Sequence, residues 1–194
     1  MPSTPEALAA ALIAWFGVHR RTLPWRTGHD GARPAYGVWL AEVMLQQTRV
    51  SVVCDYWMRF VARFPDVKDL AAASEDDVLS LWSGLGYYAR GRNLHKAAQA
   101  VVAEFGGVFP RSSSELRRLP GVGDYTAAAV AAFAADERTA VLDGNVARVL
   151  SRLCDDPTPI DTAKGKARFT AVAQTLVEAA SSSALQNEAL MELG

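Results

Sequence analysis

A single carboxylic acid lies within one of the most apolar stretches of the chain. This acid is Glu42, in a helix expected over 36–48, and its neighbours are Val38, Trp39, Leu40, Ala41, Val43, Met44 and Leu45. At helical spacing, the positions three and four residues away hold no lysine or arginine, so the segment itself offers no ion pair. Desolvation of this kind raises a carboxyl pKa and makes the group a candidate proton donor at neutral pH. The alternative is a glutamate near a helix end that turns its side chain to water.

A second carboxylate, Asp143, stands in the turn Leu142-Asp143-Gly144-Asn145, before a helix expected over 146–153. The dipole and the backbone N–H groups of a helix N-terminus keep such an aspartate ionised. Capping alone would explain it. Together with Glu42, however, it forms a pair whose environments push the two pKa values apart, which is typical of an acid and a charge-stabilising partner.

The string Leu119-Pro120-Gly121-Val122-Gly123 lies between a short helix expected over 112–118 and a helix expected to begin near Asp124. Glycines two positions apart permit a tight turn, so amide N–H groups and a helix N-terminus can face an anion. Two helices joined in this way indicate a clamp for a phosphodiester. An ordinary glycine-containing helix connection is the alternative.

An aromatic pair marks another turn, Gly84-Leu85-Gly86-Tyr87-Tyr88, which Arg90, Arg92 and Lys96 follow. Aromatic side chains on a glycine-flanked turn, next to a basic helix face, suit insertion between stacked bases beside a phosphate track. The alternative is the solvated start of a basic helix.

The elements that must position these residues have helical periodicity. Apolar residues recur three and four positions apart in stripes such as Leu8, Leu12, Trp15 and Phe16. Proline and glycine interrupt the pattern, among other places at 28–34 and 106–110, which leaves about ten short helices. Asp143-Gly144 precedes helical rather than alternating spacing, so it begins a helix and closes no hairpin. The sequence predicts an all-α fold.

Composition narrows the class of protein. The chain has 194 residues, of which 50% are hydrophobic and 21% charged, and its net charge is −1. It has no apolar run of the ~20 residues that a bilayer span needs and no secretory signal at its start, so we expect a soluble cytoplasmic protein. Cys54 and Cys154 lie far apart, which predicts neither a disulfide framework nor a cysteine metal site. A nucleic-acid partner would require basic residues gathered on one face.

These segments resemble the helix-hairpin-helix DNA glycosylases and, in detail, the adenine glycosylases of the MutY type. The resemblance covers essentially the whole chain and rests on the strings at 23–26, 42–48, 84–88, 119–123, 142–145 and 187–194. It implies two helical lobes with the active-site cleft between them. One is a six-helix barrel with the hairpin motif over 24–136; the other combines the N- and C-terminal helices of 1–23 and 137–194.

The resemblance implies base excision repair. Such an enzyme flips an adenine mispaired with 8-oxoguanine or guanine out of the duplex and hydrolyses its N-glycosidic bond. By resemblance Glu42 protonates N7 of adenine and then helps to activate water. Asp143 stabilises the positive sugar, with Asn145 as its orienting neighbour, and the hairpin places Tyr125 beside this chemistry.

Further contacts follow from the same resemblance. The residues it assigns to the adenine pocket are Arg26, Leu45, Glu188 and Met191. The residues it assigns to DNA binding are Gln47, Thr48, Leu85 and Tyr87, with Gly121, Val122 and Gly123 in the hairpin. The implied partner is double-stranded DNA with an A:8-oxoguanine or A:G mispair, and no membrane. The implied protein is a monomer of the bacterial cytoplasm that works on nucleoid DNA.

A [4Fe-4S] cluster is also implied for the full-length protein. Its four cysteines would follow Gly194, and neither Cys54 nor Cys154 matches one of them, so no metal ligand is expected in this chain. On the resemblance, the sequence is expected to be a fragment or a truncated chain that lacks the cluster loop and a separate 8-oxoguanine-reading domain.

Two alternatives stay open. An endonuclease III-like glycosylase and abasic-site lyase, acting on oxidised pyrimidines, shares the fold but needs an amine for its Schiff base. Its lysine would fall at Tyr125, and the lysines here are Lys68, Lys96, Lys164 and Lys166, all outside the hairpin. A monofunctional hydrolase therefore fits better. The other alternative, a non-catalytic helix-hairpin-helix module, explains the glycines but leaves Glu42 and Asp143 without a role.

Overall fold

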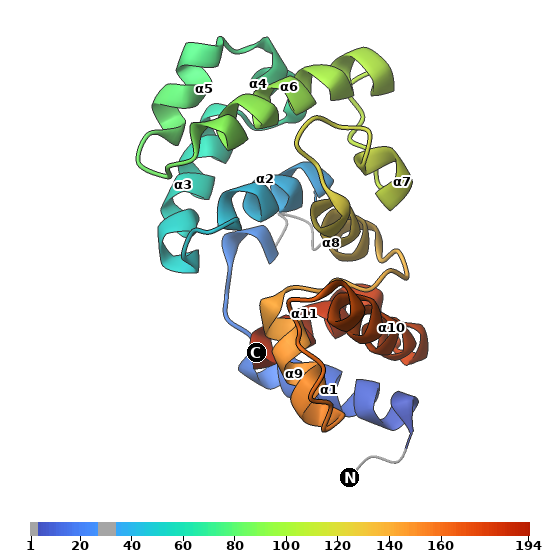
Figure 1. The fold of residues 1–194 in the computed structure, drawn as a ribbon. Helices are drawn as coiled ribbons and strands as arrows, with labels where there is room; N and C mark the ends of the chain where they lie inside the picture. The colour runs from blue at the N-terminus through green and yellow to red at the C-terminus, as the bar shows by residue number, and fades with distance from the viewer. Residues whose placement is uncertain (1–3, 27–33) are drawn as a thin grey trace. The chain divides into compact units, whose positions relative to one another are not determined.

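The computed structural model describes residues 4–26 and 34–194, and every regular element within them is helical (Figure 1). The predicted all-α class is confirmed. The break expected over 28–34 lies, except for Pro34, outside the described residues, as do residues 1–3 of the expected second lobe. Within the described part of the chain, no helix combines the length and apolar character that crossing a bilayer requires.

The chain divides into two compact units. The central unit comprises Thr22–Val130, and the terminal unit comprises Met1–Arg21 with Ala131–Gly194. The division falls within one helix, α8 (Asp124–Ala135). Each unit is described by itself below.

The central unit is built around α2 (Ala35–Leu45) (Figure 1). This helix is apolar on all sides, and every one of its residues except Leu45 is buried, as expected for a helix that runs through a core. It packs against the 3₁₀ turn η1 (Pro24–Arg26) and the helices α3 (Val50–Arg63) and α6 (Tyr88–Phe105). The remaining helices before α8 are α4 (Val67–Ala72), α5 (Glu75–Trp82) and α7 (Ser113–Leu116).

The terminal unit packs four helices around one hydrophobic cluster. These helices are α1 (Pro5–His19), α9 (Gly144–Leu153), α10 (Ala163–Ala179) and α11 (Ser183–Leu193). Phe16, Leu150, Phe169 and Leu190 contribute one large buried side chain from each helix. The cluster thus holds the start of α9, where Asp143 lies, against the two C-terminal helices.

Two helix ends differ from the sequence prediction. The helix expected to reach Thr48 ends at Leu45, and Gln47 adopts the left-handed conformation with a φ of 57°. The Arg90 guanidinium donates hydrogen bonds to the last carbonyls of this helix, so the chain can leave the helix early. The first helix of the hairpin covers Ser113–Leu116 only, because the Leu119 N–H donates to the Leu116 carbonyl and begins the turn.

Candidate functional site

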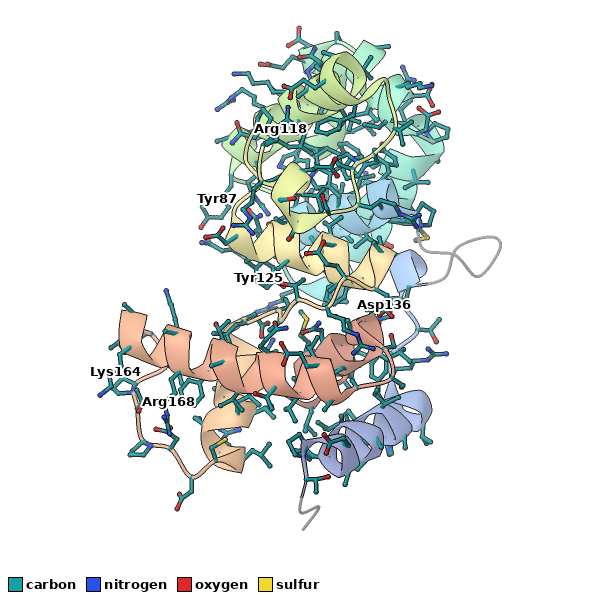
Figure 2. The ribbon with its side chains drawn as sticks, turned by 90° about the vertical axis from the view of Figure 1, so that its right-hand side faces the viewer. Tyr87, Arg118, Tyr125, Asp136, Lys164 and Arg168 are labelled. Atoms are coloured by element: carbon teal, nitrogen blue, oxygen red, sulfur yellow. The ribbon has the colours of Figure 1, made fainter. Side chains whose placement is uncertain are left out.

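Glu42 lies buried in the middle of α2, with a relative exposure of 5%. The alternative of a solvent-facing glutamate is therefore wrong. The Tyr125 hydroxyl donates to Oε2 of Glu42 over 3.2 Å, and Tyr125 stands in the first turn of α8, directly after the hairpin (Figure 2). A second contact joins the same two helices, where Nε2 of Gln46 donates to Oγ1 of Thr126 over 3.4 Å. The hairpin thus places the Tyr125 hydroxyl on the Glu42 carboxyl.

Asp143 is the N-cap of α9 and lies half-buried in the terminal unit. Its Oδ1 accepts from the Val146 N–H over 2.8 Å, and its Oδ2 accepts from Nδ2 of Asn145 over 2.9 Å. Arg148 in turn donates to the Asn145 amide oxygen. Each carboxylate oxygen has an N–H donor from its own turn, so the side chain is held in one orientation. The predicted start of a helix after Asp143 is confirmed.

The residues assigned to the adenine pocket belong to both units. Arg26 ends η1 and Leu45 ends α2, and both side chains are half-buried in the central unit. Glu188 and Met191 lie on α11 in the terminal unit, where Glu188 is buried and Met191 half-buried.

Asn187, next to Glu188, has a role that the sequence analysis did not assign. Its Oδ1 accepts from the Val141 N–H over 2.8 Å and its Nδ2 donates to the Thr139 carbonyl over 3.0 Å. Asn187 therefore fixes the segment that leads into Asp143. The Asn187 amide is fully buried and needs such partners. The sequence carried no local signal for this role, because its neighbours on either side are polar as well.

The hairpin between α7 and α8 uses its glycines in different ways. Gly121 has a φ of 74°, and a Cβ there would come within 2.7 Å of the Asn93 Cβ. A Cβ on Gly123 would meet no atom within 4 Å. Val122 is buried, and its N–H donates to the Leu119 carbonyl over 3.1 Å. Gly121 and Val122 thus determine the conformation of the turn, whereas a side chain at Gly123 would contact no other part of the protein.

The turn at 84–88 separates its side chains sharply. Leu85 is buried at 6% exposure, whereas Tyr87 is 63% exposed and lies at the surface (Figure 2). Gly84 and Gly86 have positive φ values of 100° and 71°, and Tyr87 shares the left-handed conformation at 49°. The turn therefore exposes the Tyr87 side chain to solvent and buries the Leu85 side chain in the protein.

Arg90 does not lie on the basic solvent face where the sequence pattern placed it. Its guanidinium is directed inward, and NH1 donates to the Val43 and Met44 carbonyls over 3.0 and 3.1 Å. Sequence reasoning missed this role because charge spacing along α6 does not show which arginine turns into the protein.

The described residues do not fit an iron-sulphur cluster. Among residues 4–26 and 34–194, no group of three or more His, Cys, Asp or Glu side chains could hold a metal ion. Cys54 is half-buried in the central unit and Cys154 is exposed in the terminal unit.

Comparison with known proteins shows the family of the chain. Residues 40–175 match the family model described as HhH-GPD superfamily base excision DNA repair protein. The chain belongs to this superfamily. It is also 45% identical over 196 residues to the adenine DNA glycosylase of Mus musculus, an alignment that covers 97% of this chain and 37% of the mouse protein.

Solved structures confirm the helix-hairpin-helix glycosylase fold. A thermostable thymine-DNA glycosylase superposes with a TM-score of 0.83 at 25% identity, covering 96% of this chain and 84% of that one. Endonuclease III in a trapped covalent DNA intermediate gives 0.74 at 21% identity, covering 98% and 86%. The predicted resemblance to adenine glycosylases is confirmed as well, although the chain spans little more than a third of the length of the first curated relatives.

Proposed function

We propose that this chain is the catalytic part of an adenine DNA glycosylase of base excision repair. It hydrolyses the N-glycosidic bond of adenine opposite 8-oxoguanine or guanine in duplex DNA. The observation that carries the proposal is Glu42, a carboxyl buried in an apolar helix and held by the Tyr125 hydroxyl over 3.2 Å. The 45% identity to a mouse adenine DNA glycosylase supports adenine as the excised base.

In this proposal Glu42 is the general acid. It delivers a proton to N7 of the flipped adenine, so the bond between the base and C1′ breaks and the electron pair leaves with the base. The sugar is then an oxocarbenium ion, which the carboxylate of Asp143 stabilises, with Asn145 orienting that carboxylate. Water adds to C1′ and gives its proton to Glu42, which restores the acid. Tyr125 orients the Glu42 carboxyl throughout.

The remaining assigned residues bind the substrate. We assign the adenine base to Arg26, Leu45, Glu188 and Met191. We assign duplex binding to the hairpin at 121–123 and to two turns, which contain Gln47, Thr48, Leu85 and Tyr87. Exposure of Tyr87 supports a stacking role. We assign the two lobes of the enzyme to 24–136 and to 1–23 with 137–194, and we expect a monomer that acts on bacterial nucleoid DNA.

A panel of end-labelled duplexes tests the proposal. The strands carry adenine opposite 8-oxoguanine, adenine opposite guanine, adenine opposite thymine, or an oxidised pyrimidine, and each reaction is split into halves with and without hot alkali. We expect breaks only at mispaired adenine and only after alkali, because hydrolysis leaves an intact abasic strand. Breaks at the oxidised pyrimidine without alkali would favour the endonuclease III-like alternative. Binding without any excision would favour a non-catalytic module.

Borohydride separates the two enzyme classes further. A lyase forms an imine between an amine and the sugar, and reduction turns that imine into a stable protein-DNA adduct. The wild-type protein should give no adduct, whereas Tyr125→Lys should gain one, because the new amine stands one hydrogen bond from Glu42. Efficient wild-type trapping that is lost with Lys96→Ala would show that the monofunctional assignment is wrong.

A further inference from the structure

The guanidinium of Arg90 serves the end of α2. NH1 donates to the carbonyls of Val43 and Met44 over 3.0 and 3.1 Å, and also to the carbonyl of Gln46. The last carbonyls of a helix have no partner within it, and a cation at this end is favoured by the helix dipole. Arg90 therefore caps the C-terminus of α2, although it belongs to another helix, α6. Such a cap ordinarily comes from the loop that follows the helix.

The same guanidinium also holds the turn at 84–88. NH2 donates to the Leu85 carbonyl over 3.1 Å, to the Thr48 hydroxyl over 3.4 Å and to the Gly86 carbonyl over 3.5 Å. The guanidinium carbon lies 5.4 Å from the ring centres of both Trp82 and Tyr87. Burial lowers the pKa of the Arg90 guanidinium, in keeping with a group that faces carbonyls rather than water.

Both segments that Arg90 joins contain a strained residue. Gln47 and Tyr87 have φ values of 57° and 49°, in the left-handed region that side chains other than glycine rarely adopt. Such conformations persist only where the surrounding structure over-determines them, and they cluster at ligand-binding sites. Arg90 contacts the residue on either side of Gln47 and the residue before Tyr87.

We propose that Arg90 is a positioning residue that locks the turns at 46–48 and 84–87 into one rigid surface for the duplex. This inference rests on the proposed function, in which Gln47, Thr48, Leu85 and Tyr87 contact DNA. Arg90 itself touches neither substrate nor reacting atoms. Arg90 fixes the spacing between the two turns before DNA binds. The duplex therefore meets a preformed surface, and binding does not pay the entropy of ordering that surface.

The planar fork of arginine explains why this position needs arginine. Five N–H donors in a fixed plane can reach acceptors of both turns at once, whereas a lysine ammonium is a compact point charge with three donors. Arg90 also lines a cavity of about 70 Å³ together with Gln46, Asn93 and Gly121, so the hairpin borders the same group. Arg90→Lys is therefore expected to lose the lock.

Hydrogen exchange of the free protein tests the lock without any use of activity. In Arg90→Lys and Arg90→Met, peptides covering 46–48 and 84–87 should both exchange at least tenfold faster, while α3 and α8 keep their protection. Arg92→Met is the matched control, because Arg92 is an exposed arginine two residues further along α6. Faster exchange in only one turn, in neither turn, or across the whole central unit would overturn the proposal.

Salt dependence of duplex binding tests the role toward DNA. A phosphate contact contributes about −0.9 to the slope of log K against log salt, whereas a positioning residue contributes nothing to it. Arg90→Met should bind mispaired duplex about tenfold more weakly with an unchanged slope. A slope reduced by about one in Arg90→Met would assign Arg90 to a phosphate and overturn the proposal. Absence of adenine excision by the wild type would refute the proposed function but leave the exchange result intact.

Discussion

The two carboxyls at the centre of the proposed chemistry are held in opposite ways. Glu42 lies in the interior of an apolar helix and accepts from Tyr125, which is 83 residues away in the sequence. Asp143 stands at a helix start and accepts from Asn145 and Val146, two and three residues further on. An acid must keep its proton in apolar surroundings, whereas a charge stabiliser needs nearby N–H donors. The comparison shows that the acid depends on a contact between distant residues, whereas the charge stabiliser is held by its own turn.

Two arginines differ in the number of segments that each one holds. Arg138 lies in the terminal unit and donates to the Val177 and Ala180 carbonyls, each over 2.9 Å, so it closes the end of α10 alone. Arg90 closes the end of α2, 47 residues away, and also holds the turn that directly precedes its own helix. One arginine therefore supports a helix, and the other connects two candidate binding turns.

The largest effect is expected from removing the proton of the buried carboxyl. Glu42→Gln keeps the shape and most hydrogen bonding but cannot transfer a proton, so the single-turnover rate of adenine excision should fall by about 10² to 10⁴. Affinity for mispaired duplex should remain near the wild-type value. Glu104→Gln, at an exposed partner of Arg118, is the charge-matched control and should retain full activity. A Glu42→Gln rate above about a tenth of wild type would remove Glu42 from its role.

Asp143 allows its two tasks, capping and charge, to be separated. Asparagine caps a helix about as well as aspartate, so Asp143→Asn should leave the melting temperature unchanged but reduce the excision rate by about 10²-fold. Asp143→Ala should lose the cap as well, at a cost of about 1 kcal/mol of stability. Melting curves and single-turnover rates on the two variants check this. Full activity in Asp143→Asn would leave capping as the only role of this side chain.

The hairpin offers a matched pair of glycines that separates a strained position from an open one. Gly121→Ala places a Cβ in a left-handed conformation and against Asn93, which strains the turn by about 1 to 2 kcal/mol. We expect the turn to relax in the free variant, so restoring it on binding should cost up to roughly tenfold in duplex affinity. A Cβ on Gly123 meets no protein atom within 4 Å, so Gly123→Ala leaves the turn unstrained and should lose less affinity than Gly121→Ala. The loss should be equal for matched and mispaired duplexes, because phosphate contacts carry no sequence information. Equal affinities for the two variants would place the clamp elsewhere.

The smallest predicted effect concerns a carboxylate outside the proposed chemistry, Asp156. Hydrogen bonds from Thr158, followed by the ion pair with Arg168 near the start of α10 (Figure 2), lower the pKa of Asp156 to about 2. Its unfolded value is about 3.9, so its stabilising contribution is present above that pH and is lost as the pH falls toward 2. Asp156→Asn should melt below the wild type at pH 5 and approach it near pH 2. A constant difference across this range would contradict the prediction.

Local rules explain what the sequence by itself determined. Helical periodicity predicted the all-α class, and the turn before Val146 predicted the cap at Asp143. The apolar neighbours of Glu42 indicated burial as one of two alternatives, and the structure decided for it. The periodicity and the cap each depend on residues within one or two helical turns. The pattern of the chain is therefore enough to predict them, and helix ends were less exact because distant groups can take the last carbonyls.

Tertiary structure alone decided which distant groups meet. It brought the Tyr125 hydroxyl to Glu42, turned Arg90 inward to carbonyls of two segments, and buried Leu85 while leaving Tyr87 exposed. Spacing along a helix cannot predict these features, because each depends on what the packing of the unit places against the side chain. A buried polar group takes whichever partner the packing of the core brings within hydrogen-bond distance, and that packing is a property of the whole unit.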